Sequence, residues 1–338
     1  MSISKNLPPI FSFHPTPPPL FNEPAPLPKC RVILGIDEAG RGPVVGPMVY
    51  GGCWIAEEEE LDEGGTKRKR ESAWASAGFA DSKVLSRDER ERLFEWLVDA
   101  GRGGRPKGDT SKALPSDELG ELPHVGFATV ELDAPLISAA MTGLPNVNLN
   151  TLSHSAAAAI IAHVLYTLHL DIAHVYVDTV GSADRYAELL RSSFPNLQVT
   201  VESKADAKYR TVSAASVVAK VCRDRRMDLL SAQLGTQLGS GYPGDPATKA
   251  YIRSVAHPLL GYGECVRFSW KTVDNALKAK DSGAESLLFL DTADDGSVGT
   301  WQREGAAALA SFLGGGSATS GGGRTRVTKG LCLRRFEK

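Results

Sequence analysis

The sequence is poor in cysteine and has no long apolar run. Its 338 residues include five cysteines that lie far apart, with no C-x-x-C pair, and this spacing argues against a structural zinc site and a disulfide framework. No stretch approaches the roughly 18 uninterrupted apolar residues that a membrane-spanning helix needs. The N-terminus also lacks the apolar core of a cleavable signal peptide. We therefore expect reduced thiols and no membrane partner.

An excess of charge of one sign is missing as well. The chain has 38 basic and 40 acidic residues and a formal net charge of −2. This balance excludes a wholly basic, histone-like protein but permits a local basic groove. Hydrophobic residues make up 42% of the chain, which is enough for a sizeable core.

Shifts in composition divide the chain. Nine of the 20 prolines fall in residues 1–28, and such a segment lacks the backbone donors that helix or sheet needs. Two polar stretches, 57–80 and 101–124, are interpreted as insertions, and the basic run at 67–70 is typical of a solvated loop or of a nuclear-import signal. The expected parts are a disordered leader at 1–28, an α/β domain at 29–235, a helical C-terminal part at 236–280 and a flexible tail at 281–338.

Short apolar runs rich in β-branched residues are followed by helical patterns. The periodicity predicts strands at 31–37, 44–55, 125–132, 173–177 and 197–202, with a bulge at Gly51-Gly52. It predicts helices at 86–98, 150–169, 182–193, 212–230, 245–256 and 269–280, with Ser86 and Glu89 as a capping box and Asp245 and Ser269 as N-caps. Strands that first cluster and then alternate with helices favour an α/β fold with a mixed sheet.

Acidic residues end two of the predicted strands. Asp37 and Glu38 end the first strand, and Asp178 ends the fourth. Adjacent residues of a regular strand point to opposite faces, so Asp37 and Glu38 can share one site only if the chain turns at Glu38. We expect such a turn, because Gly40 and Gly42 give the backbone the conformational freedom that it needs. Carboxylates gathered at one sheet edge are costly unless divalent cations neutralise them, and all-oxygen ligation favours Mg²⁺ or Mn²⁺. The alternative is that each acidic residue serves only as a turn or cap.

Residues 202–226 are locally basic, with seven Lys or Arg against three Asp or Glu. Asp224 lies among these cations near the end of an Ala/Val-rich helix. It is interpreted either as half of surface ion pairs or as a further metal ligand beside phosphate-binding side chains. The loop at 239–243 presents Tyr242, which either caps a core or stacks on a nucleotide.

Six motifs in this order resemble the ribonuclease HII family, and within it the catalytic subunits of the eukaryotic type 2 enzymes. They lie at 37–43, 81–83, 178–181, 204–206, 213–224 and 239–243. The resemblance covers about 30–280. It implies a ribonuclease H-like fold, which is a five-stranded mixed sheet flanked by helices, with a small helical C-terminal part.

The resemblance also implies roles for residues. The expected catalytic and metal-binding residues are Asp37, Glu38, Asp178 and Asp224. The expected substrate-binding residues are Gly40, Arg41, Gly42, Tyr242, Lys83, Lys204 and Lys208. Two Mg²⁺ or Mn²⁺ ions per site are expected as cofactors, clamping the phosphodiester during hydrolysis.

The implied activity is hydrolysis on the 5′ side of ribonucleotides, leaving 5′-phosphates, in RNA–DNA hybrids and at single ribonucleotides in duplex DNA. This activity would serve the removal of RNA primers and of ribonucleotides in DNA replication and repair. The expected location is the nucleus, with the cytoplasm as a second location. The alternatives are a ribonuclease H-like nuclease acting on DNA alone, and a non-catalytic nucleic-acid-binding scaffold. The first would need the carboxylates without the Gly40-Arg41-Gly42 loop and Tyr242, and the second would lack a carboxylate.

Eukaryotic members of this family act with two accessory subunits, B and C, and the resemblance implies the same partners here. In the tail, apolar residues lie at 301–313, before the glycine run 314–316, and at 331–336, after the glycine run 321–323. A helix as short as 301–313 is marginal alone. We therefore expect the tail from 281, with nearby helices, to contribute to binding these partners, the alternative being a solvated linker.

Overall fold

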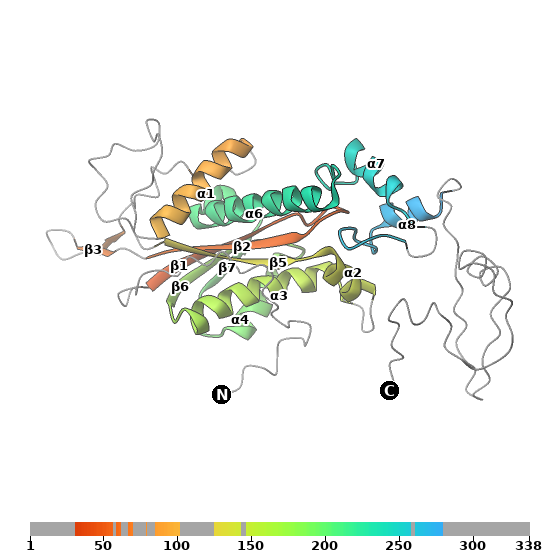
Figure 1. Cartoon of the computed structure of the whole chain (residues 1–338). Helices are drawn as coiled ribbons and strands as arrows, with labels where there is room; N and C mark the ends of the chain where they lie inside the picture. Colours follow the sequence, from red (N-terminus) through yellow and green to blue (C-terminus); the bar gives the residue numbers. More distant parts are fainter. Residues whose placement is uncertain are drawn as a thin grey trace, which may run out of the picture.

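The chain folds around a five-stranded sheet in the order β5-β2-β1-β6-β7 (Figure 1). In this computed structural model the described residues are 31–56, 59–61, 67–69, 79, 85–101, 125–142, 147–257 and 261–279. The strands of the sheet are β1 (Arg31–Ala39), β2 (Met48–Ala56), β5 (Val125–Leu132), β6 (Asp171–Asp178) and β7 (Val199–Glu202). β2 runs antiparallel to β1 and β5, whereas β6 runs parallel to β1 and β7. The predicted mixed sheet is confirmed.

Helices cover both faces of this sheet (Figure 1). The helices of the described part are α1 (Arg87–Gly101), α2 (Ala134–Thr142), α3 (Leu149–Ala162), α4 (Ala183–Ser193), α5 (Ala205–Lys208), α6 (Arg210–Leu234), α7 (Pro246–Ser254) and α8 (Lys271–Leu277). Of these, α7 and α8 lie beyond the end of the sheet (Figure 1). α1 and α6 bury one apolar cluster against the sheet, and α2, α3 and α4 bury another against the opposite face. The site therefore rests on a layered α/β scaffold, as predicted.

Glycines allow α3 and α6 to approach β2 from opposite sides. A Cβ on Gly51 would lie 2.4 Å from the carbonyl oxygen of Ala215 in α6, and one on Gly52 would lie 2.4 Å from Cγ2 of Ile160 in α3. The predicted bulge at this pair is wrong, because the pairing register with β1 and β5 passes through both residues without a shift. Close helix packing, and not a break in the strand, requires glycine there.

Local signals placed most helix starts correctly. Ser86 and Glu89 form the predicted capping box, with Glu89 N–H donating to Ser86 Oγ at 3.2 Å and Ser86 N–H donating to Glu89 Oε2 at 2.7 Å. Asp245 caps α7 by accepting from the Ala247 N–H. The predicted cap at Ser269 is wrong, because Trp270 takes that position without a side-chain bond.

Three short elements were not predicted. α2 and α5 are too short to show a clear period, and the hairpin of β3 (Glu59–Leu61) with β4 (Lys67–Lys69) lies inside the first insertion. In addition, the predicted helix at 150–169 ends in a π-helical turn, His163–Thr167.

The chain after α6 returns to the connection between β1 and β2. Val44 and Val45 from this connection join α7 and α8 in a third apolar cluster. Val45 also pairs with Val266 in an isolated antiparallel bridge. The C-terminal helices therefore pack against the segment that directly follows Asp37 and Glu38.

Several predictions fall outside the described residues. They concern the leader at 1–28, the tail at 281–338, most of both insertions, and Lys83. Within the described part, no helix has the length and apolarity required to cross a membrane.

The packing of α6 on β1 gives a test of the fold. A Cβ on Gly35 would lie 2.2 Å from the backbone carbon of Thr211 in α6, so Gly35→Ala should lower the free energy of unfolding by about 1–3 kcal/mol or more. Gly244→Ala is the matched control, because no atom of the described residues lies within 4 Å of its added Cβ. Urea denaturation measures both variants, and equal stability of the two would contradict this packing.

Candidate active site

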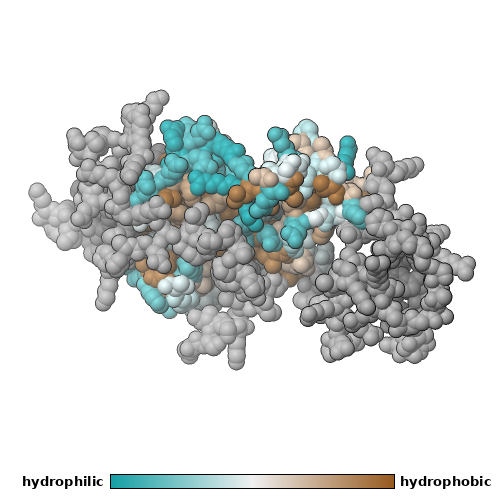
Figure 2. Space-filling view, in the orientation of Figure 1, coloured by the Kyte–Doolittle hydropathy of each residue, from teal (hydrophilic) through white to brown (hydrophobic). Residues whose placement is uncertain are grey.

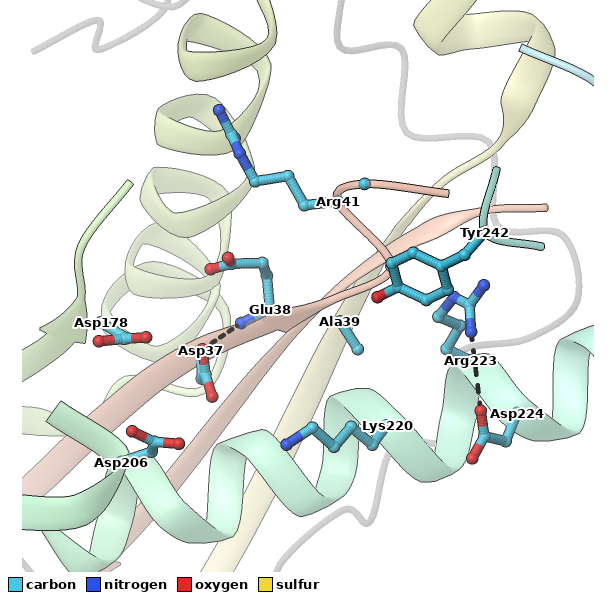
Figure 3. Close-up of a pocket in the computed structure, with 12 residues that line it drawn as sticks. Asp37, Glu38, Ala39, Arg41, Asp178, Asp206, Lys220, Arg223, Asp224 and Tyr242 are labelled. Atoms are coloured by element: carbon cyan, nitrogen blue, oxygen red, sulfur yellow. Dashed lines mark hydrogen bonds and ion pairs between the residues drawn. The ribbon is translucent and has the colours of Figure 1, made fainter. Parts of the chain in front are cut away.

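A pocket of about 300 Å³ opens where β1 and β6 end (Figure 3). It is lined by Asp37, Glu38, Ala39, Gly40, Arg41, Gly42, Asp178, Asp206, Lys220, Arg223, Asp224 and Tyr242. The four predicted carboxylates, the predicted glycine-rich loop and Tyr242 are all among them. Segments separated by about 200 residues in sequence therefore meet at one edge of the sheet.

Asp37 and Glu38 both lie inside β1, which continues to Ala39. The predicted turn at Glu38 is wrong, since Glu38 still pairs with Tyr50 of β2 in regular register. Their side chains accordingly point to opposite sides of the strand (Figure 3). Asp37 Oδ1 accepts a hydrogen bond of 2.7 Å from the Glu38 N–H. The pocket thus reaches around the strand end and takes one carboxylate from each face.

Asp178 and Asp206 complete the acidic side of the pocket. Asp178 is the last residue of β6, the parallel neighbour of β1, and its Oδ1 accepts from the Ala205 N–H at 3.0 Å. Asp206 belongs to the short helix α5 and is 4% exposed. Lys204, just before α5, has a left-handed backbone with φ of 58°. This turn brings α5 back over the end of β6.

Burial and mutual repulsion shape the charge of this cluster. Burial raises the pKa of Asp37 to about 7, with Asp178 and Asp206 adding repulsion and a Ser216 hydrogen bond opposing it. Burial likewise raises the pKa of Glu38 to about 8, with added repulsion from Asp37 and Asp178. The neighbouring donors therefore do not offset the cost of ionising these two carboxyl groups where they are buried.

Asp224 lines the same pocket from α6 but stands apart from this group (Figure 3). It forms ion pairs with Arg90 at 3.6 Å and Arg223 at 3.7 Å. The charges that raise the pKa of Asp37 are those of Asp178 and Asp206. The geometry therefore favours Asp206 over Asp224 as the fourth member of the acidic cluster. The predicted role of Asp224 stays a prediction.

Asp206 was not predicted as a site residue, although the motif at 204–206 contains it. The signal that could have found it is topological. β7 is the parallel neighbour of β6 and ends at Glu202, so a carboxylate shortly after β7 lies at the same sheet edge as Asp178. Lys220 and Arg223 of α6 also line the pocket. They belong to the basic stretch at 202–226 but were not among the expected substrate-binding residues. Figure 3 shows the Lys220 side chain extending along α6 on the side of Asp206.

The loop after β1 forms the opposite wall of the pocket. Gly40 has a positive φ of 78°, a conformation that L side chains rarely adopt. A Cβ there would also lie 2.4 Å from Nε of Arg223. The Arg41 guanidinium donates to Ser153 Oγ at 2.5 Å and to Asn150 Oδ1, both in α3. The loop is thereby held in one conformation beside Glu38.

Tyr242 faces the pocket and does not cap a core. Its side chain is 46% exposed, and a Cβ on Gly42 would lie 3.4 Å from its ring. The buried Arg223 guanidinium lies 5.8 Å from the ring centroid and donates to the Ser240 carbonyl at 2.8 Å. Arg223 therefore connects the glycine-rich loop with the loop that carries Tyr242.

The predicted lysines are not brought into the pocket. Lys204 and Lys208 lie near it in sequence but are not among its lining residues, and Lys208 pairs with Glu202. Other cations of the basic stretch are also paired, Arg225 with Glu91 at 2.5 Å and Arg226 with Glu131 at 2.9 Å. The strongly hydrophilic surface in Figure 2, where Figure 1 places α1, includes such paired charges.

The acidic cluster fits divalent metal ions by its chemistry. Its side chains offer only oxygen ligands, which suit Mg²⁺ or Mn²⁺. Oε2 of Glu38 is buried and has no hydrogen-bond partner within the part of the chain that the structure describes. As placed, no three His, Cys, Asp or Glu side chains of the described residues converge closely enough to hold one ion. A bound ion would thus draw these carboxylates together.

Comparison with known proteins decides the family. The ribonuclease HII family model matches residues 34–273. A ribonuclease H2 subunit of Bos taurus is 38% identical over 285 residues, covering 82% of this chain and 80% of the relative. The chain belongs to the ribonuclease HII family. Its activity is that of a ribonuclease H.

Solved structures agree with this assignment. The ribonuclease H2 of Pyrococcus horikoshii OT3 is similar at a TM-score of 0.52 and 28% identity, covering 72% of this chain and 96% of the archaeal one. Bst-RNase HIII, solved in complex with Mn²⁺, shares the fold at a TM-score of 0.50 and 17% identity, covering 73% of this chain and 70% of that one. The family's matched region includes every described pocket residue.

The raised pKa values predict how stability depends on pH without metal. Because the folded state holds protons on Asp37 and Glu38 up to about pH 7 and 8, and the unfolded chain loses them near pH 4, stability should fall as pH rises through this window. We expect the melting temperature in EDTA to drop on the order of 5–10 °C between pH 5 and 8.5.

The double variant Asp37→Asn, Glu38→Gln is the control, because neither new side chain titrates. It should lose most of this slope in the same thermal scans. An unchanged slope would show that the two carboxyl groups do not carry the pH dependence.

Proposed function

We propose that the chain hydrolyses the phosphodiester on the 5′ side of ribonucleotides, in RNA–DNA hybrids and at single ribonucleotides in duplex DNA. One observation carries this proposal. The acidic cluster, the Gly40-Arg41-Gly42 loop and Tyr242 line a single pocket. A group that can hold metal ions and a group that can contact a sugar therefore lie on opposite walls of one site.

We propose that Asp37, Glu38, Asp178 and Asp206 hold two Mg²⁺ or Mn²⁺ ions. The burial and mutual repulsion of these carboxyl groups support this, as does the Mn²⁺ bound by the structurally similar Bst-RNase HIII. When bound, such ions activate water and stabilise the leaving 3′ oxygen. The chain itself holds Asp178 in place through the Ala205 N–H, and Asp37 through the Glu38 N–H.

We propose that the glycine-rich loop recognises the ribose of the substrate. The 2′-OH is what distinguishes RNA from DNA at a given linkage, and only backbone groups can approach it closely where a side chain would clash. The loop lines the pocket beside Glu38, and α3 holds its Arg41 side chain. A sugar placed here would lie next to the acidic cluster.

Tyr242 is the proposed contact for the neighbouring nucleotide. Its exposed ring lies beside Gly42, so it can pack on the sugar or base that follows the ribonucleotide. Such packing leaves little room for an extra hydroxyl there and would favour a step from RNA to DNA.

The alternatives fit the pocket less well. A DNA nuclease would need the carboxylates but has no use for the glycine-rich loop and Tyr242, which line this pocket with them. A binding scaffold would gain nothing from four carboxylates at a site for a polyanion, because their charge repels phosphate.

For its assembly, we propose accessory subunits B and C, supported by the similarity to a ribonuclease H2 subunit, with the tail from 281 contributing to the contact. Deleting 299–338 should then weaken co-purification with both partners and leave Mg²⁺ binding unchanged. Undiminished assembly would place the contact elsewhere.

We also propose a nuclear location, supported by the basic run at 67–70 and testable by microscopy of the tagged chain.

Asparagine substitutions test the metal assignment. Asp37→Asn and Asp206→Asn remove one charge each with almost no change of shape, and each should lower cleavage of a single-ribonucleotide duplex by more than about 100-fold. Asp224→Asn is the matched variant, because it removes an equal charge from the same pocket but from outside the cluster. We expect it to retain far more activity than Asp206→Asn, measured as initial rates in Mg²⁺.

The thermal shift caused by Mg²⁺ gives a second readout of the same variants. It should vanish in Asp206→Asn and persist in Asp224→Asn. The reverse order in both measurements would restore Asp224 as the fourth ligand and remove Asp206.

A further inference from the structure

Arg267 is a fully buried arginine whose guanidinium hydrogen bonds, among the described residues, all go to backbone carbonyls. Its side chain is 0% exposed. Nε donates to the Gly46 carbonyl at 2.9 Å, Nη1 to the Arg41 carbonyl at 3.0 Å, and Nη2 to the Gly40 carbonyl at 2.6 Å. All three acceptors belong to the connection between β1 and β2.

A buried guanidinium is costly unless it is paired and hydrogen-bonded. Among the described residues, no carboxylate lies within ion-pair distance of Arg267. Burial lowers the pKa of its guanidinium, and the positive charge of Arg223 lowers it further. The three hydrogen bonds to carbonyls are therefore what offsets the cost of burying the Arg267 guanidinium. Its planar fork suits several acceptors at once, whereas a lysine ammonium does not reproduce it.

Trp270 extends the same set of contacts by one carbonyl. Its Nε1–H donates to the Gly42 carbonyl at 3.1 Å. Its ring also lies 4.9 Å from the Arg267 guanidinium, a cation–π distance. Arg267 and Trp270 together thus bind the carbonyls of Gly40, Arg41 and Gly42, which are the three residues of the glycine-rich loop.

These carbonyl contacts also fix the direction of the loop N–H groups, because the peptide bond is planar. In a trans peptide the carbonyl of one residue and the N–H of the next point in opposite directions. Because the Gly40 and Arg41 carbonyls point at Arg267, the N–H groups of Arg41 and Gly42 point away from it. Arg267 lies behind the loop and does not line the pocket, whereas the loop does.

We propose that Arg267 and Trp270 are positioning residues that hold the glycine-rich loop with its Arg41 and Gly42 N–H groups directed to the pocket, ready to donate to a ribose 2′-oxygen. This inference rests on the proposed function and deepens it. It also explains why the C-terminal part packs against the β1–β2 connection, since that part supplies both residues.

Two variants test this set of contacts. Arg267→Lys keeps the charge but removes the fork, and Trp270→Phe keeps an aromatic ring over the guanidinium but removes the indole N–H. The milder Trp270→Phe keeps the test sound if Arg267→Lys folds poorly. Arg191→Lys and Trp54→Phe are the matched controls. Arg191 donates to the Val199 carbonyl, which is at the start of β7. The buried Nε1 of Trp54 has no hydrogen-bond partner among the described residues.

Hydrogen exchange of the full-length chain, without substrate, reports on the loop alone. In both test variants, peptides covering 40–46 should exchange several-fold faster than in the wild type, while peptides from β6 and α6 keep their rates. Neither control should change exchange at 40–46. Unchanged exchange at 40–46 in both test variants would overturn the proposal.

Kinetics report on the ribose contact. We expect kcat/KM for a single-ribonucleotide duplex to fall at least about fivefold in both test variants, as for the loss of one hydrogen bond. The Ki of an all-DNA duplex, which lacks the 2′-OH, should stay within about twofold, and so should the Mg²⁺ thermal shift. The controls should leave all three values unchanged.

A parallel rise in the Ki of the all-DNA duplex, or unchanged kcat/KM beside faster exchange, would show a structural role only and overturn the proposal. A wild-type chain that fails to cut the ribonucleotide duplex would overturn the proposed function, while the exchange data would still decide whether these two side chains hold the loop.

Discussion

The burial and mutual repulsion of neighbouring carboxyl groups are the constraint on which the site depends. Asp37, Glu38, Asp178 and Asp206 meet because β1 and β6 are parallel neighbours and α5 turns back over their ends. Such a cluster is unfavourable without cations, so the scaffold must hold it from behind. α6 does this on one face, packed so closely that Gly35 and Gly51 cannot carry a side chain.

The wall opposite the cluster is built from positive charge and backbone. Arg41, Arg223 and Arg267 hold the glycine-rich loop or its neighbour, and their partners are mainly neutral oxygens. The pocket thus has an acidic wall suited to metal ions and a wall of loop backbone that these guanidinium groups hold in place. A substrate that carries both phosphate and a ribose hydroxyl would use both walls.

The sequence predicted what depends on local pattern. Apolar runs identified the strands that end at Asp37 and Asp178, and local motifs identified the glycine-rich loop and Tyr242. It did not reveal that β1 continues through Glu38, because the end of a strand depends on its pairing, here with β2. It missed Asp206 because α5 is one turn long, and it misread Gly51-Gly52 because helix packing leaves no local signature. Arg267 lies 226 residues from Arg41, so only the fold connects them.

Mapping the cut in a labelled duplex that contains one ribonucleotide tests the account most directly. Purified chain, with its accessory partners if they are required, would be incubated in Mg²⁺ beside an all-DNA duplex of the same sequence. The account predicts one cut on the 5′ side of the ribonucleotide, a 5′-phosphate on that residue and no cut in the all-DNA duplex. Cleavage of both duplexes, or a cut on the 3′ side, would contradict it.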